Sequence, residues 1–314
     1  MFEQLQSLDA VSINFNAAGI RTVNIILAVI MFGVALGIKP QIFKDIFSKP
    51  KSVIVGLFLQ WIGLPALTFL FIMLLNDHIT PMVAMGMILV ASCPGGNISN
   101  FISSFSKANV ELSISMTAIT TCCAAFVTPI NFAFWGGLYY NMSSVDMAGV
   151  PELNIGFLQM FKEVLLLIGV PVVLGLLFAH YFPKITKKIT TPFQYLSLAF
   201  FIAMIVIAFS QNFQIFIDHI LFIFFIVLCH NFLALSLGFS GATLFKLPKR
   251  DRRSLTIEVG IQNSGLGLVL LFNPEIFPQT GVGGMLFITA WWGIWHIVSG
   301  LAVATIFRRK QLTE

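Results

Sequence analysis

The stretch Ala91–Asn100, ASCPGGNISN, interrupts an otherwise apolar run that extends from residue 81 to residue 106. Proline removes a backbone donor and its ring clashes with the preceding turn, so a helix must break near Pro94. Pro94 lies 13 residues from Pro81 and 13 from Lys107, which at about 1.5 Å per residue is near the middle of a bilayer. Lipid cannot satisfy the backbone groups that a break sets free, so they must face one another, water or a ligand.

A second stretch, EVGIQNSG at Glu258–Gly265, breaks the run from 253 to 273 at a similar depth, because Asn263 lies ten residues from Arg253. The two interrupted runs are the third and the eighth of nine, and spans an odd number of crossings apart run in opposite directions. That is the arrangement of inverted-topology repeats. Simple helix kinks are the alternative, but two matched breaks rich in Asn, Gln and Ser favour a binding site.

The composition indicates that lipid is the solvent of this chain. Of its 314 residues, 57% are hydrophobic and 10% are charged, whereas a soluble domain carries about 25% charged residues. We therefore expect an all-α membrane protein with nine transmembrane helices, each near the roughly 20 residues that a span requires. The nine runs are 20–38, 52–76, 81–106, 109–136, 155–181, 191–210, 215–243, 253–273 and 281–307.

The basic residues predict the orientation. Only Arg21 and Lys162 lie toward one side, and 16 of the 18 basic residues follow the odd-numbered spans. The positive-inside rule then puts the N-terminus outside and the C-terminus in the cytoplasm, as a multi-pass protein of the plasma membrane, or of the inner membrane in a Gram-negative cell. This distribution explains the net charge of +5 without a nucleic-acid partner. The sixteen are Lys39, Lys44, Lys49, Lys51, Lys107, Lys184, Lys187, Lys188, Lys246, Lys249, Arg250, Arg252, Arg253, Arg308, Arg309 and Lys310.

Four parts follow along the chain. We expect an extracytoplasmic segment at 1–19, a first repeat of four spans at 20–136, a second repeat of five spans at 155–307 and a cytoplasmic tail at 308–314. Span five would be the first helix of a five-helix unit whose counterpart is missing from the first half. Residues 1–19 carry Glu3 and Asp9 and lack a basic start, so no cleavable signal is visible.

Glu258 is the one carboxylate that we place deep inside a span. A charge there costs at least about 2.5–3.5 kcal/mol on insertion scales, and no Lys or Arg lies at that depth. Either the acid is protonated or a bound cation compensates it; the plain alternative is a neutral acid in a hydrogen-bond network. Sodium is a hard cation that prefers oxygen ligands. Oxygen atoms nearby belong to Gln60, Ser99, Asn100, Ser113, Thr117, Gln262 and the carbonyls of Val259 and Ile261.

Other polar residues have simpler interpretations. Ser113 and Thr117 share one face of a helix, but each on its own could merely bond to a preceding carbonyl. His230 and its neighbour Asn231 are most simply helix–helix hydrogen-bond partners, whereas His296 lies far enough along the last span to reach the broken region. The four cysteines fall in apolar runs without metal spacing and are expected as small buried residues.

These residues resemble the bile acid:sodium symporter family. The stretches that carry the resemblance are QWIGLP at Gln60–Pro65, CPGGNISN at Cys93–Asn100, LSISMT at Leu112–Thr117 and EVGIQNSG at Glu258–Gly265, and the similarity extends over nearly all of 20–307. The resemblance implies a core domain, in which the two broken helices cross, and a panel domain, with parts of each repeat in both. It also implies two sodium ions as coupling ions and no organic cofactor.

The resemblance assigns residues to each site. One sodium site would use Ser99, Asn100, Ser113, Thr117 and Glu258; the other would use Gln60, Glu258, Val259, Ile261 and Gln262. Substrate contacts would map to Asn97, Asn263 and His296. One departure is Ile297, where some bacterial relatives carry Asn, so the identity of the substrate does not carry over.

The expected function is sodium-coupled symport of an organic anion by alternating access, a secondary active transport. Bile-acid-like molecules, steroid sulfates and small carboxylates such as pantoate all remain open as substrates. The alternative on the same fold is a proton-coupled transporter or exchanger that uses Glu258 as the proton carrier; a passive channel or a sensor is a further alternative. The chain lacks paired carboxylates, a His-metal cluster and a Ser–His pair at matching depth, so we do not expect an enzyme.

Overall fold

The computed structural model describes residues 5, 8, 9, 17–38, 50–143, 157–210, 213–274, 276, 277 and 280–310. The basic residues Lys39, Lys44 and Lys49, most of the segment 1–19, most of the loop 137–154 and residues 311–314 lie outside this part. The helices are α2 (Ala17–Leu36), α4 (Pro50–Phe58), η1 (Leu59–Gly63), α5 (Leu64–Leu74), α6 (Pro81–Ser92), α7 (Ile98–Phe105), α8 (Val110–Met142), α9 (Phe157–Val164), η2 (Leu165–Gly169), α10 (Val170–Tyr181), α11 (Pro183–Ser210), α12 (Phe213–Leu244), α13 (Lys249–Gly260), α14 (Ser264–Leu271) and α15 (Gly283–Arg309).

Five of these helical stretches are long and apolar enough to cross a membrane by length and composition. Within the described ranges they are Pro50–Leu74, Val110–Met142, Phe161–Tyr181, Ile217–Leu244 and Gly283–Arg309. This confirms a helical, multi-pass membrane protein. The count of nine crossings and the inverted repeat stay predictions. The interrupted third and eighth runs fold as short helices, α6 with α7 and α13 with α14, and the first and sixth runs, which lie in α2 and α11, are not among these five stretches.

Several helix ends differ from the predicted ones. The helix α11 begins at Pro183, ahead of the predicted 191, and α13 begins at Lys249, ahead of 253. In both cases the basic residues that we assigned to a loop lie in the first helical turns. Proline has no N–H to lose at a first helical position, so Pro183 starts α11 without a missing hydrogen bond.

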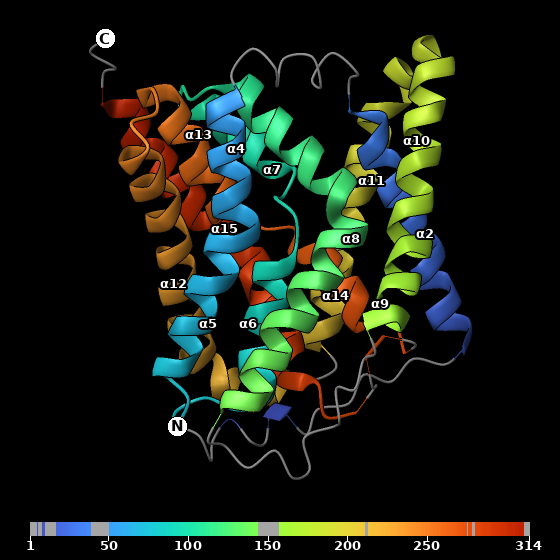
Figure 1. Ribbon diagram of the computed structural model, residues 1–314. Helices are drawn as coiled ribbons and strands as arrows, with labels where there is room; N and C mark the ends of the chain where they lie inside the picture. Colours follow the sequence, from blue (N-terminus) through green and yellow to red (C-terminus); the bar gives the residue numbers. More distant parts are fainter. Residues whose placement is uncertain are drawn as a thin grey trace.

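The helices fall into two groups in space (Figure 1). On one side, α2 packs against α10 and α11. On the other side, α5, α8, α14 and α15 pack around α6, every residue of which is buried. A helix that is apolar on all faces is expected only where protein surrounds it. Figure 1 shows α15 ending at the same end of the molecule at which α4 and α13 begin.

A π-helical turn shapes the middle of the second predicted span. Pro65, at the start of α5, cannot donate to the carbonyl of Trp61, and η1 covers this stretch. The freed carbonyl of Trp61 instead accepts a hydrogen bond from Nδ2 of Asn131 on α8, over 2.9 Å. The irregular turn is therefore fixed against α8, and it carries Gln60 toward the breaks.

Candidate functional site

The two helix breaks pair with each other as an isolated antiparallel bridge. The N–H of Gly96 donates to the carbonyl of Ile261 over 2.9 Å, and the N–H of Asn263 donates to the carbonyl of Pro94 over 2.8 Å. Backbone groups released from one helix thus satisfy groups released from the other, as an apolar surrounding requires. The pairing brings the end of α6 and the start of α7 against the end of α13 and the start of α14.

All five residues predicted for the first ion site converge on one buried carboxyl group. Ser99 on α7 donates to Oε1 of Glu258 over 2.5 Å, and Ser113 on α8 donates to the same oxygen. The hydroxyl of Thr117 lies 3.2 Å from Oε2. Oδ1 of Asn100 also lies within hydrogen-bond distance of these two hydroxyl oxygens, 3.0 Å from that of Ser113 and 3.3 Å from that of Thr117. Three helices, α7, α8 and α13, therefore supply one cluster of side-chain oxygen atoms.

The donor set of this cluster fits a hard cation. Its carboxyl group is 1% exposed, and Ser99 and Ser113 are fully buried. Within the described part of the chain, the partners of Glu258 are hydroxyl groups, and no lysine or arginine is among them. Hydroxyl, amide and carboxylate oxygens are the ligands that hard cations prefer. The cluster thus has the chemistry to hold a sodium ion.

Bonding back to the preceding turn, the plain alternative for such hydroxyl groups, occurs at three positions on α8, one of which is Thr120, whose hydroxyl donates to the carbonyl of Thr117 over 3.2 Å. Ser115 donates to the carbonyl of Glu111 over 2.8 Å and points away from the cluster. Thr117 contacts the carbonyl of Ser113 at 3.1 Å in addition to the carboxyl group. Ser113 itself is directed to Asn100 and Glu258, so the bland interpretation does not account for it.

The second predicted set comes together in part. Nε2 of Gln60 donates to Oε1 of Gln262 over 2.6 Å, and Nε2 of Gln262 donates to the carbonyl of Val259 over 2.8 Å. The carbonyl of Ile261 accepts the N–H of Gly96 from the first break. The hydrogen bonds of the Glu258 side chain, by contrast, go to the first cluster.

One oxygen of the second set is left over. Oε1 of Gln60 is buried and has no hydrogen-bond partner among the described residues. An unpaired buried acceptor costs free energy unless something else satisfies it. Together with the carbonyl of Val259, which retains a second lone pair, this oxygen fits a cation better than it fits an apolar surrounding.

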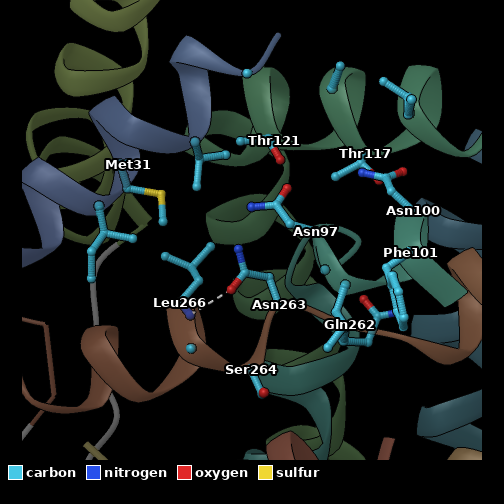
Figure 2. Close-up of a pocket in the computed structure, with 18 of the residues that line it drawn as sticks. Met31, Asn97, Asn100, Phe101, Thr117, Thr121, Gln262, Asn263, Ser264 and Leu266 are labelled. Atoms are coloured by element: carbon cyan, nitrogen blue, oxygen red, sulfur yellow. Dashed lines mark hydrogen bonds between the residues drawn. The ribbon is translucent and has the colours of Figure 1, made fainter. Parts of the chain in front are cut away.

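A cavity of about 570 Å³ lies beside the paired breaks (Figure 2). One wall is apolar and comes from α2, through residues that include Ile30, Met31 and Val34. The facing wall is polar and comes from the two breaks and from α8. The size lies within the usual range for small-molecule pockets, about 300–1,000 Å³. Its position between the two groups of helices suits a ligand with one apolar and one polar face.

The three predicted substrate residues all line this cavity. Figure 2 shows the side chains of Asn97 and Asn263 pointing into the same space. Oδ1 of Asn263 also accepts the N–H of Leu266, which caps the start of α14. His296, on α15, is 4% exposed, and its Nδ1 has no partner among the described residues. Ile297, the position of the departure noted above, lines the cavity too.

Two further cavity residues were missed by sequence reasoning. Thr121 and Ser264 are both buried, and their hydroxyl oxygens lack partners in the described structure. Thr121 lies one helical turn beyond Thr117, and this spacing places it on the same face of α8. Ser264 directly follows Asn263. Their spacing from residues already chosen is therefore a signal that could have found both of them.

A buried network behind the second break holds it in place. Nδ2 of Asn231 on α12 donates to the carbonyl of Gly260, the last residue of α13, over 2.7 Å. Ser299 on α15 donates to Oδ1 of Asn231 over 2.5 Å. Nε2 of His230 lies 2.7 Å from the hydroxyl of Thr68 on α5, so His230 joins two helices as predicted.

The cysteines only partly follow their prediction. Cys93 is buried and Cys122 and Cys123 are half-buried, but Cys229 is exposed. The prediction of a buried side chain was therefore wrong for Cys229. Its exposure on a membrane helix has a simple reason, because lipid accepts a small apolar side chain as readily as a protein core does. In the described residues, no group of three His, Cys, Asp or Glu side chains could hold a metal ion.

Comparison with known proteins places this site in context. The model of the sodium bile acid symporter family matches residues 24–219. An uncharacterized sodium-dependent transporter of Bacillus subtilis is 31% identical over 288 residues, which is 92% of this chain and 83% of that protein.

Two more distant relatives carry related descriptions. A probable chloroplastic sodium/metabolite cotransporter of Arabidopsis thaliana is 28% identical over 92% of this chain and 68% of its own length. Sodium/bile acid cotransporter 5 of Rattus norvegicus is 25% identical over 82% of this chain and 56% of its own length. Sodium appears in all three descriptions, whereas the transported molecule differs or is not stated.

Proposed function

The chain belongs to the sodium bile acid symporter family, and on that premise we propose that it imports an organic anion together with sodium ions by alternating access. One observation carries the proposal. Glu258 is buried among hydroxyl groups from α7 and α8, with no basic partner in the described structure. A buried carboxylate requires a compensating charge, and oxygen ligands select a hard cation.

We assign two sodium ions to the two oxygen sets. The first ion would be held by Ser99, Asn100, Ser113, Thr117 and Glu258. The second would be held by Gln60, Gln262 and the carbonyls of Val259 and Ile261, with Glu258 between the two sets. The main support for the second ion is the unpaired Oε1 of Gln60.

The anion site lies next to the ions. Asn97 and Asn263 stand at the N-terminal ends of α7 and α14, where backbone N–H groups give a partial positive charge. An anionic group would bind there, with the apolar part of the molecule against α2 and a polar substituent near His296. Bile-acid-like molecules, steroid sulfates and small carboxylates such as pantoate all fit this description, and the cavity does not choose among them.

Ion and anion binding would be coupled because they use the same two breaks. The residues that hold the ions also fix the relative positions of α7 and α14, whose starts form the anion site. In this proposal the panel domain consists of α2, α9, α10 and α11, and the remaining helices form the core domain. The panel would move against the core and so open the cavity to one side of the membrane at a time. The proposal includes nine crossings, two inverted repeats, an outer N-terminus and a cytoplasmic C-terminus.

The driving force is sufficient for accumulation. A tenfold sodium gradient contributes about 1.4 kcal/mol for each ion. Two sodium ions with a monoanion move one net charge inward, and a potential of 100 mV adds about 2.3 kcal/mol for that charge. The sum of about 5 kcal/mol permits accumulation of a few thousandfold.

Proton coupling is the competing function on this fold. Three hydroxyl groups lie within hydrogen-bond distance of the carboxyl group of Glu258, and all three can donate to it when it is ionised. A proton carrier also has no use for the surrounding oxygen cluster. Uptake into proteoliposomes decides between them: symport with sodium requires uptake that rises with external sodium at fixed pH. Uptake that follows a pH gradient and ignores sodium would establish the proton mechanism.

A further inference from the structure

A second buried carboxylate lies in the first turn of α13, at the end of the molecule where α15 ends (Figure 1). Asp251 is 2% exposed. Its Oδ2 accepts a hydrogen bond from the hydroxyl of Ser52 on α4 over 2.6 Å, and its Oδ1 accepts one from Nδ2 of Asn109 over 2.7 Å. Hydrogen bonds to an ionised acceptor are shorter and stronger than neutral ones. One side chain therefore joins three segments that are distant in sequence.

Each of the three segments supplies proposed ion ligands. Ser52 lies eight residues before Gln60 on the continuous stretch α4–η1. Asn109 caps α8, since its Oδ1 accepts the N–H of Leu112, and it lies four residues before Ser113. Asp251 lies seven residues before Glu258 on α13. At about 1.5 Å per residue, each junction lies some 6–12 Å along its helix from the ligand that the helix presents.

The contacts of Asn109 make this junction specific. Its backbone N–H donates to the carbonyl of Arg250 over 3.2 Å, and its carbonyl accepts from the hydroxyl of Ser254 over 2.7 Å. With the bond to Asp251, three hydrogen bonds fix the start of α8 against the first turns of α13. This sets the register between the helix that carries Ser113 and the helix that carries Glu258.

The short helix α7 is joined to the same region. Arg253 donates from one nitrogen to the carbonyl of Ser106, just after α7, over 2.9 Å, and from another to the carbonyl of Lys310 over 2.7 Å. The helix α7 carries Ser99 and Asn100. All four segments with side-chain ligands are thus tied together at one end of α13.

We propose that Asp251 is a positioning residue for sodium: by joining α4, α8 and α13 ahead of their ligands, it sets the affinity of the ion sites. The inference rests on the sodium-coupled function proposed above. Asp251 lies two helical turns from Glu258 and does not contact the ion; it acts through the separation and register of the helices. A site of this kind must hold its ligands within about 0.5 Å, so a small shift of one helix weakens binding.

The test compares sodium binding by three variants with that of the wild type. Asp251→Asn removes the charge and turns one acceptor into a donor that faces the amide of Asn109. Asn109→Ser keeps a residue that caps α8 but is too short to reach Asp251. Ser52→Ala removes the remaining contact. The matched control is Asp218→Asn, which alters an exposed carboxylate on α12 that is bonded to Gln214.

The measurement is the thermal unfolding of the purified full-length protein at increasing sodium chloride, with choline chloride keeping the ionic strength constant. The sodium concentration for half-maximal stabilisation should rise at least fivefold in Asp251→Asn and in Asn109→Ser, and less in Ser52→Ala. The variant with both Asp251→Asn and Asn109→Ser should resemble the single variants, because both changes break the same contact. Asp218→Asn should match the wild type.

A merely structural role gives a different result. If Asp251 has only a structural role, the variants unfold at a lower temperature without sodium, but the sodium concentration for half-maximal stabilisation stays unchanged. This outcome overturns the inference. If Asp251→Asn does not fold, unchanged sodium dependence of both Asn109→Ser and Ser52→Ala overturns it equally. A wild-type protein that sodium fails to stabilise contradicts the proposed function itself, so the two failures are distinguishable.

Discussion

A side-chain carbon on residue 95 would stand 2.9 Å from Oε2 of Glu258. The backbone of the first break therefore lies directly against the carboxyl group of the second. Glycine is the residue that permits this approach, because any other side chain would occupy the space of the carboxylate. The two breaks thus share one polar centre, and a change in either should be felt by both.

Replacement of Gly95 tests this approach. In Gly95→Ala the new methyl group should displace the carboxylate and raise the sodium concentration for half-maximal stabilisation about tenfold, which corresponds to about 1.4 kcal/mol. The control is Gly137→Ala on α8, where an added carbon meets nothing within 4 Å. That variant should bind sodium as the wild type does. Equal sodium affinity in both variants would show that the space beside residue 95 is not needed.

The second ion set predicts a change in cooperativity. Gln60→Leu keeps the approximate size of the side chain and removes the oxygen that lacks a partner. Uptake should then depend on sodium with a Hill coefficient near one, where the wild type shows a value near two, because only the first set remains. Initial rates of uptake over a range of sodium concentrations measure this. A Hill coefficient that stays at the wild-type value argues against an ion at Gln60.

The unpaired hydroxyl of Thr121 predicts a contact with the ligand. In Thr121→Val the shape is kept and a hydrogen bond of about 0.5–1.5 kcal/mol is lost, so the affinity for a ligand with a polar group should fall about two- to tenfold. Thr128→Val is the matched control, because Thr128 is also buried without a partner on α8 but does not line the cavity. Ligand titration at saturating sodium compares the two. If both variants lose the same ligand affinity, the polar group of the ligand does not contact Thr121.

Asp9 predicts a dependence of stability on pH. It lies outside the spans, accepts from Thr80 over 3.0 Å, and burial raises its pKa from 3.8 to about 7. Between these values the folded protein holds a proton that the unfolded chain loses, so this group's contribution to stability falls as the pH rises from about 4 to 7 and is constant above.

The variant Asp9→Asn isolates this effect, because it keeps an acceptor and removes the charge. It should unfold at a higher temperature than the wild type at pH 8, and this difference should shrink as the pH falls and vanish near pH 4, where the carboxyl group is protonated in both the folded and the unfolded chain. Each pKa unit corresponds to about 1.4 kcal/mol, so the difference at pH 8 should be a few kcal/mol at most. A difference that does not change with pH would exclude titration of this carboxyl group.

The residues of the polar cluster could be recognised in the sequence because polar side chains are conspicuous in apolar helices. Ser99, Ser113 and Glu258 stood out for their cost in lipid, and the structure places them in direct contact. Their function as ion ligands stays a prediction, and so do the nine crossings and the repeat. The ends of α11 and α13 were missed because their basic first turns resemble loops, although a helix can extend beyond the membrane.

Contacts between segments that are distant in the chain could not be predicted from the sequence. The pairing of the two breaks depends on backbone groups, which carry no sequence signal of their own. Asn231 was read as a general helix contact, but it caps the carbonyl of Gly260 at the second break. Asp251 lies in a run of basic residues and carried no signal in the sequence; only packing shows that it joins Ser52 to Asn109.

Direct binding of sodium to the purified protein is the measurement closest to the central claim. Isothermal titration of the wild type with sodium chloride, at constant ionic strength, should show saturable binding in the millimolar range. Glu258→Gln should show none and should remain folded by circular dichroism, because the amide lacks the charge that the cation neutralises. Absence of binding by the wild type, or full binding by Glu258→Gln, would contradict the account.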